Sequence, residues 1–135
     1  MPARILIADD YDDNRELLRL LLLGAKYEVI EARDGQQCLD LAREHLPDLI
    51  MMDLSMPKLD GWEAFEALQA DPHTKSIPCV VTTASADMDG MQARKYGFSA
   101  YVNKPFNTAA LLETVSSVLR QESGEIPLAV RSSTN

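Results

Sequence analysis

Two kinds of apolar segment alternate along the chain, and this alternation limits the possible folds more than any other feature. Short runs rich in β-branched residues give way to longer segments with apolar residues at spacings of three and four, and this happens five times. The short runs are typical of strands and the longer segments of amphipathic helices. Five strands alternating with five helices predict an α/β fold, a parallel sheet with helices on both faces.

The boundaries of these segments can be placed from the pattern. We predict strands at Arg4–Ala8, Glu28–Ala32, Leu49–Asp53, Cys79–Thr83 and Ala100–Asn103. We predict helices at about Asp13–Leu23, Gln36–His45, Gly61–Ala70, Asp87–Tyr96 and Thr108–Gln121. A chain of 135 residues suits one domain. We therefore expect a domain over residues 1–122 and a flexible tail over residues 123–135, which contains Pro, Ser and Thr.

Charge and composition argue against several classes of partner. Lys and Arg total 13 against 21 Asp and Glu, a net charge of −8, and no basic run is visible. Direct nucleic-acid binding and membrane binding are therefore not expected. The start of the chain lacks the apolar segment of a signal peptide, so we expect a cytoplasmic protein. Cys38 and Cys79 form no CxxC pair; buried reduced thiols are favoured, although their spacing does not exclude a disulfide.

Polar residues follow four of the five predicted strands. Asp9 and Asp10 come after the first strand, Asp53 ends the third, Thr82–Thr83 end the fourth and Lys104–Pro105 follow the fifth. Ligands of open parallel sheets bind outside the carboxyl ends of the strands. The fold, if correct, brings three carboxylates, a hydroxyl and an ammonium to one edge.

Such a group of carboxylates needs neutralisation, because like charges in a small crevice repel one another. A hard divalent ion, Mg²⁺ or Mn²⁺, held by Asp9, Asp10 and Asp53 would supply it, and Lys104 would add a further positive charge. Metal and lysine together suit phosphoryl transfer, and a carboxylate can accept the phosphoryl group as an aspartyl phosphate. Asp53 is the candidate acceptor, because it lies centrally between the metal and Lys104.

Four stretches of the sequence resemble the response-regulator receiver family, which includes the bacterial chemotaxis regulator. They are ADDYDDN at 8–14, IMMDLSMPKLDGWE at 50–63, VVTTASA at 80–86 and GFSAYVNKPF at 97–106, in the family's order and spacing. The resemblance implies a doubly wound, flavodoxin-like sheet with strand order 2-1-3-4-5. Because the chain stops soon after the fifth helix, it resembles a stand-alone, single-domain response regulator.

The resemblance also implies roles at the acidic site. Asp53 is similar to the family's phosphoacceptor, and Asp9 and Asp10 to the acidic pair that holds Mg²⁺, with Asp10 the more direct ligand. The backbone carbonyl of Ser55, two residues after the acceptor, would be a further metal ligand. Lys104 is similar to the lysine that pairs with the phosphoryl group.

Further positions match the family's switch and its structural residues. Thr83 is similar to the switch hydroxyl, although Thr82 next to it competes for this role, and Tyr101 fits the aromatic switch position. The Lys104–Pro105 bond is expected to be cis. Gly61 is interpreted as structural, because the turn before the third helix needs glycine's permissive backbone.

The function implied is a phosphoryl-accepting switch of a two-component system or phosphorelay. A sensor histidine kinase or a phosphotransfer protein would be the donor, and an unknown protein would read the face formed by the fourth helix, fifth strand and fifth helix. Such a receiver is not an enzyme beyond its own phosphoryl transfer and autodephosphorylation. Two alternative functions are less favoured. A metal-dependent phosphohydrolase would have an acidic residue at the position of Ser55, and a nucleotide- or flavin-binding module would not carry the stretch ADDYDD, which repels phosphate.

Overall fold

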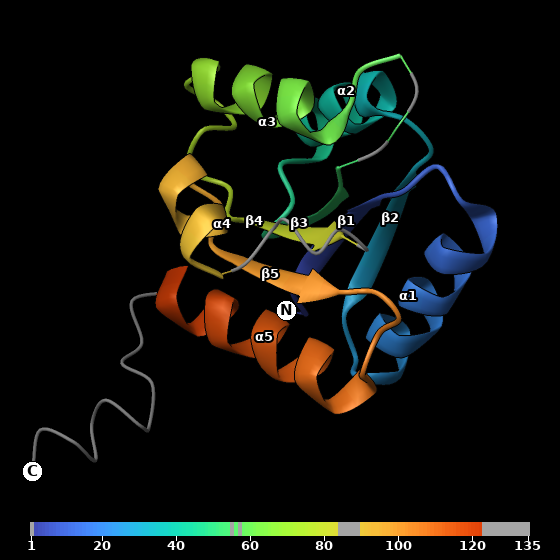
Figure 1. Ribbon diagram of the computed structural model, residues 1–135. Helices are drawn as coiled ribbons and strands as arrows, with labels where there is room; N and C mark the ends of the chain where they lie inside the picture. The colour runs from blue at the N-terminus through green and yellow to red at the C-terminus, as the bar shows by residue number, and fades with distance from the viewer. Residues whose placement is uncertain (1, 55, 57, 84–89, 123–135) are drawn as a thin grey trace, which may run out of the picture.

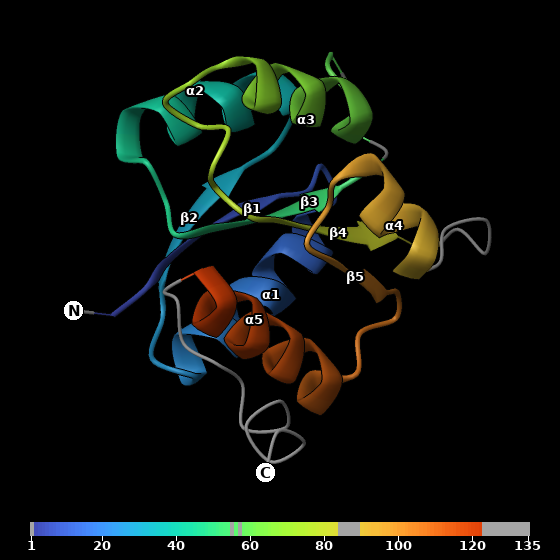
Figure 2. The same cartoon turned by 90° about the vertical axis from the view of Figure 1, so that its left-hand side faces the viewer.

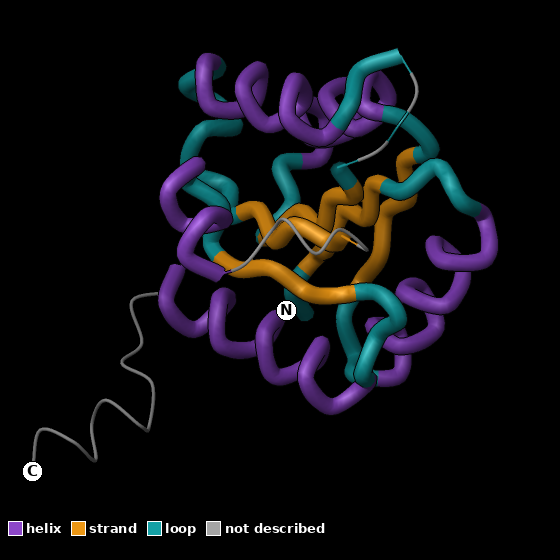
Figure 3. The backbone as a smooth tube through the Cα atoms, viewed as in Figure 1, coloured by secondary structure: helices purple, strands orange, loops and turns teal. Residues whose placement is uncertain are grey.

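The computed structural model describes residues 2–54, 56, 58–83 and 90–122, and it confirms the predicted α/β architecture. A five-stranded parallel sheet with the order β2-β1-β3-β4-β5 lies between two layers of helices (Figures 1 and 3). Three predicted features fall outside the described residues: Ser55, the first residues of the helix expected from Asp87, and the tail at 123–135.

The observed strands have the predicted bounds. The strands are β1 (Arg4–Ala8), β2 (Glu28–Ala32), β3 (Leu49–Asp53), β4 (Cys79–Thr83) and β5 (Ala100–Asn103). The helices are α1 (Asp12–Gly24), α2 (Gly35–His45), α3 (Gly61–Ala70), α4 (described over Gly90–Tyr96) and α5 (Thr108–Glu122). Helices α2 and α5 differ from the prediction by one residue at one end, and α1 is one residue longer at each end.

The helices divide between the two faces of the sheet. Helices α2, α3 and α4 cover one face, and α1 and α5 cover the other (Figure 2). The central strands β3 and β4 are buried along their whole length, as the continuous apolar run of β3 predicts. None of the described helices is long and apolar enough to cross a membrane.

Both cysteines are free and buried, which settles the choice between thiols and a disulfide. Burial raises the pKa of the Cys38 thiol to about 12, and the nearby Asp34 carboxylate adds to this effect. Burial raises the pKa of Cys79 as well. Because the thiolate is the reactive form, neither residue is suited to nucleophilic or redox chemistry in the folded protein.

Helix α2 begins one residue earlier than predicted because Asp34 caps it. The Asp34 carboxylate accepts a hydrogen bond of 2.7 Å from the backbone N–H of Gln37, and Gly35 is therefore the first helical residue. This hydrogen bond is the main reason why the pKa of Asp34 lies below its usual value; Lys58 lowers it further, while burial opposes the shift.

We expect Asp34→Ala to destabilise the protein by about 1 kcal/mol at neutral pH, the usual cost of losing such a cap. Because the pKa of Asp34 is lowered on folding, its stabilisation is present above the unfolded pKa of about 3.9 and is lost as the pH falls. Urea unfolding at several pH values should therefore show the difference from wild type shrinking in acid. Asp40→Ala, at an exposed position of the same helix, is the control. A difference independent of pH would contradict this account of the cap.

Candidate functional site

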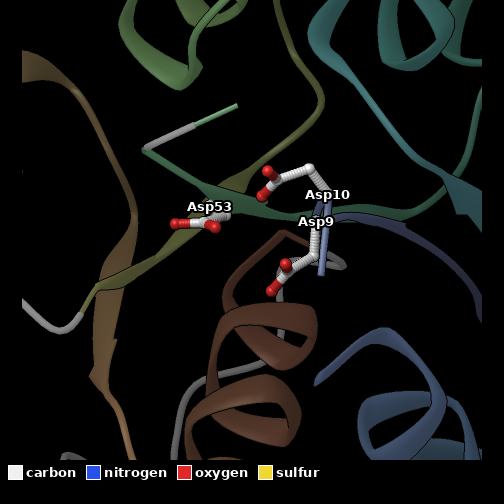
Figure 4. A group of neighbouring side chains, drawn as sticks. All are labelled: Asp9, Asp10 and Asp53. Carbon is white, nitrogen blue, oxygen red and sulfur yellow. The ribbon is translucent and has the colours of Figure 1, made fainter. Parts of the chain in front are cut away.

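Three carboxylates converge at the carboxyl edge of the sheet. Asp9 and Asp10 follow β1, and Asp53 ends β3, the strand that pairs with β1 through Ala8 and Met52. One oxygen from each carboxylate lies within 4.8 Å of the others. Figure 4 shows the three side chains around a common space. The neighbouring strands thus bring together residues that are 43 or 44 positions apart, as predicted.

Asp9, Asp10 and Asp53 together form the acid cluster. Its three side chains differ in their exposure to solvent. Asp9 is completely buried and Asp53 is 7% exposed, whereas Asp10 is open to solvent. The backbone N–H of Tyr11 donates a hydrogen bond of 2.9 Å to Oδ1 of Asp9. Asp9 is therefore fixed from within the fold, while Asp10 lies where a ligand can enter from solvent.

Lys104 supplies a positive charge to the acid cluster. Its Nζ lies 3.3 Å from Oδ2 of Asp9 and 3.2 Å from Oδ2 of Asp53. The side chain is 16% exposed, so these interactions are screened less than surface pairs. The Lys104–Pro105 peptide bond is cis, which confirms that expectation.

The charges of the site do not balance. Within the part of the chain that the structure describes, the cluster holds three carboxylates, and the Lys104 ammonium pairs with two of them, Asp9 and Asp53. Carboxylates at such short separations repel one another strongly in a partly buried crevice. All the converging donor atoms are hard oxygens, the type of ligand that Mg²⁺ and Mn²⁺ prefer. In number, charge and chemistry, the residues fit a divalent metal ion.

Gly61 is structural, as predicted, but for a different reason. A Cβ at this position would lie 2.4 Å from the carbonyl oxygen of Asp53 and 2.7 Å from Cα of Leu54. Its backbone is not in the left-handed region, so close approach rather than conformational freedom requires glycine. Asp60, the residue before Gly61, caps α3 by accepting a hydrogen bond from the backbone N–H of Glu63.

The two threonines at the end of β4 are both buried, and β4 pairs with β3. Thr82 lies opposite Asp53 in the parallel register, and Thr83 is one residue further on. The backbone N–H of Lys104 donates a hydrogen bond of 2.9 Å to the carbonyl oxygen of Thr83, which ties the ends of β4 and β5 together. The preference for Thr83 over Thr82 as the switch stays a prediction.

Tyr101 lies in β5 and is half-buried, and its side chain packs against the apolar core beneath α2, α3 and α4. Its strand, β5, pairs with β4 and ends one residue before Lys104. Its role as a switch stays a prediction, as does the metal-binding role of Ser55.

Sequence reasoning missed Arg15. Its guanidinium donates a hydrogen bond of 2.9 Å to the carbonyl oxygen of Asp9 and pairs with Glu31 at 3.3 Å and with Asp12. These contacts fix the backbone of the first acidic residue from α1 and from β2. The available signal was a single arginine within the acidic stretch ADDYDDNRE.

The doubly wound sheet with an acid cluster at its carboxyl edge defines a class of signalling domains, and comparison with known proteins identifies it. The model of the response regulator receiver domain matches residues 5–116, and the chain belongs to this family. Receiver domains are switches of two-component signalling and interact with histidine kinases and phosphotransfer proteins.

Individual relatives resemble the chain over most of its length. The polar-differentiation response regulator DivK of Brucella anthropi is 39% identical over 120 residues, which cover 88% of this chain and 98% of the relative. The solved structure of the chemotaxis protein CheY4 of Vibrio cholerae has a TM-score of 0.79 and 30% identity, covering 87% of this chain and 99% of its own.

A second solved structure contains a metal ion. It is the receiver domain of the sensor histidine kinase PA1611 from Pseudomonas aeruginosa, which holds a magnesium ion in its active-site cleft. It is 27% identical to this chain, covers 93% of it and 100% of its own length, and has a TM-score of 0.78.

Proposed function

We propose that the protein accepts a phosphoryl group on Asp53, with Mg²⁺ or Mn²⁺ held by Asp9, Asp10 and Asp53. The observation that carries the proposal is the convergence of the three carboxylates at the carboxyl edge of the sheet, where Lys104 pairs with Asp9 and Asp53. The carbonyl of Ser55 is a further proposed ligand, on the family resemblance. The last described helix ends at Glu122, and we take residues 1–122 as the receiver domain.

The chemistry is a transfer between two nucleophiles. A carboxylate oxygen of Asp53 attacks the phosphorus atom, and an oxygen–phosphorus bond forms as the bond to the donor nitrogen or oxygen breaks. The leaving group departs with the electron pair of the broken bond. A bound divalent ion supplies positive charge for the phosphoryl oxygens. Lys104 is already placed between Asp9 and Asp53, so its ammonium can pair with the charge that the new group brings.

The donor of the phosphoryl group is a sensor histidine kinase or a phosphotransfer protein, and the phosphorylated domain is the signalling state. The domain catalyses only its own phosphorylation and autodephosphorylation. Phosphorylation biases an equilibrium between two conformations. We propose that Thr83 and Tyr101 relay this bias to the α4–β5–α5 face, where a protein partner reads it. The hydrogen bond from Lys104 to Thr83 and the position of Tyr101 in β5 support this route.

The proposal is tested by measuring the mass of the intact protein after incubation with acetyl phosphate and Mg²⁺. We expect the gain of one phosphoryl group, and no gain when EDTA removes the metal. A folded protein that gains no phosphoryl group under these conditions would contradict the proposal.

Magnesium should also stabilise the protein without any phosphodonor, because it binds the folded site and not the unfolded chain. At 100 times its dissociation constant, Mg²⁺ is expected to add about 2.7 kcal/mol to the free energy of unfolding, seen as a higher melting temperature. Asp10→Asn, a change at the exposed ligand, should lose much of this shift. An unchanged melting temperature at saturating Mg²⁺ would count against the metal site.

A further inference from the structure

Lys58 and Leu59, in the connection between β3 and α3, lie against the N-terminal end of α2. A Cβ at Gly35 would lie 1.9 Å from the carbonyl oxygen of Leu59 and 2.7 Å from its carbonyl carbon. Real Cβ atoms do not come this close to backbone atoms, so any larger residue at position 35 must displace the loop or the helix. The first residue of α2 thus sets how near Leu59 can lie to that helix.

A second contact joins the same two elements. Nζ of Lys58 lies 3.6 Å from Oδ2 of Asp34, the residue that caps α2. Lys58 has a φ of 67°, in the left-handed region that lysine rarely adopts. Its contacts with neighbouring residues therefore hold Lys58 in an unfavourable backbone conformation. Between these contacts and Asp53, the side chain of Met56 is buried in the apolar core.

The far end of the loop is fixed to the acceptor itself. The N–H of Gly61 donates a hydrogen bond of 2.9 Å to the carbonyl oxygen of Leu54, and Gly61 packs directly on the backbone of Asp53. A displacement of Leu59 is therefore passed over a few residues to the backbone beside the acid cluster. Helix α2 itself contributes no residue to that cluster.

We propose that Gly35 and Lys58 are positioning residues for the phosphoacceptor site, which set the distance between the β3–α3 loop and the acid cluster. This inference rests on the proposed function, because the quantity it concerns is the fit of metal and phosphoryl group at Asp53. The contact of Gly35 with Leu59 keeps the loop close, and the Lys58–Asp34 pair holds it there.

The first test compares two glycine substitutions. Gly35→Ala must move backbone atoms by about 1 Å, whereas nothing lies within 4 Å of a Cβ at Gly24, the last residue of α1. We expect Gly35→Ala to weaken Mg²⁺ binding in calorimetric titration and to slow phosphorylation by acetyl phosphate on the order of 100-fold, the usual effect of such a misplacement. Gly24→Ala should leave both quantities unchanged.

The second test uses charge and does not threaten the fold. The Lys58 side chain is 73% exposed, and Lys58→Glu turns its attraction to Asp34 into repulsion. The added negative charge would by itself raise the affinity of the acid cluster for Mg²⁺, whereas displacement of the loop lowers this affinity. We expect the dissociation constant to rise about two- to five-fold, in keeping with an exposed pair.

Lys26→Glu is the matched control for the charge. Lys26 is also exposed and has a φ of 75°, but it lies in the turn before β2, at the opposite edge of the sheet. This variant should show Mg²⁺ affinity and phosphorylation rate close to those of the wild type.

The outcomes separate this inference from the proposed function. If the wild type neither binds Mg²⁺ nor gains a phosphoryl group, the proposed function is wrong and the inference falls with it. If the wild type does both, and Lys58→Glu binds Mg²⁺ as well as Lys26→Glu or better, the positioning role is overturned. The comparison of Lys58→Glu with Lys26→Glu tests the positioning role even if Gly35→Ala does not fold.

Discussion

Asp53→Asn should abolish the uptake of a phosphoryl group from acetyl phosphate at every Mg²⁺ concentration. The amide keeps the size and shape of the side chain at the end of β3, but it removes the nucleophilic oxygen. The measurement is the intact mass of the protein over time. Asp48→Asn, at an exposed position just before β3, is a control that should be phosphorylated like the wild type.

Asp10→Asn separates the acceptor from a metal ligand. Asp10 is exposed and is proposed only to hold the metal, so the loss in this variant should be recovered by raising the Mg²⁺ concentration. The loss in Asp53→Asn should not be recovered. Uptake that persists in Asp53→Asn would move the acceptor to another carboxylate of the cluster.

Lys104→Met is expected to change two quantities in opposite directions. Loss of the ammonium should slow phosphoryl transfer about 100- to 1000-fold, the usual effect of removing one preorganised group that stabilises transition-state charge. The same change removes the ammonium that pairs with Asp9 and Asp53, so Mg²⁺ should bind more tightly. The measurements are the phosphorylation rate at saturating Mg²⁺ and a calorimetric titration with Mg²⁺.

General damage to the fold would weaken both properties, so the opposite signs identify the role of the charge. Lys75→Met, at an exposed position of the α3–β4 connection, is the matched control and should change neither quantity. A Lys104→Met variant that is phosphorylated at the rate of the wild type would remove Lys104 from the transfer step.

Much of the fold and the site could be predicted because the sequence patterns are local and the sheet rule is general. The continuous apolar run Leu49–Asp53 marks a strand covered on both faces, and the residue at its end is then placed by the parallel topology. The same reasoning placed Asp9 beside Asp53, since neighbouring parallel strands end at one edge.

The remaining features depend on contacts between segments distant in sequence. No local pattern shows that Gly61 packs on the carbonyl of Asp53 or that Gly35 packs on Leu59, because these approaches arise only when the helices lie on the sheet. Arg15 was missed for the same reason, since its partners Asp9 and Glu31 come together only in the fold.

The order of the strands also determines when in folding the site can exist. Asp9 and Lys104 are 95 residues apart, and they meet only after β1, β3, β4 and β5 have paired in turn. Contacts of such sequence separation form late, because the chain must first close long loops. A fragment that lacks β5 therefore cannot assemble the complete site. With the proposed role of Lys104, it follows that phosphoryl uptake should reach its full rate only in molecules whose sheet has assembled as far as β5.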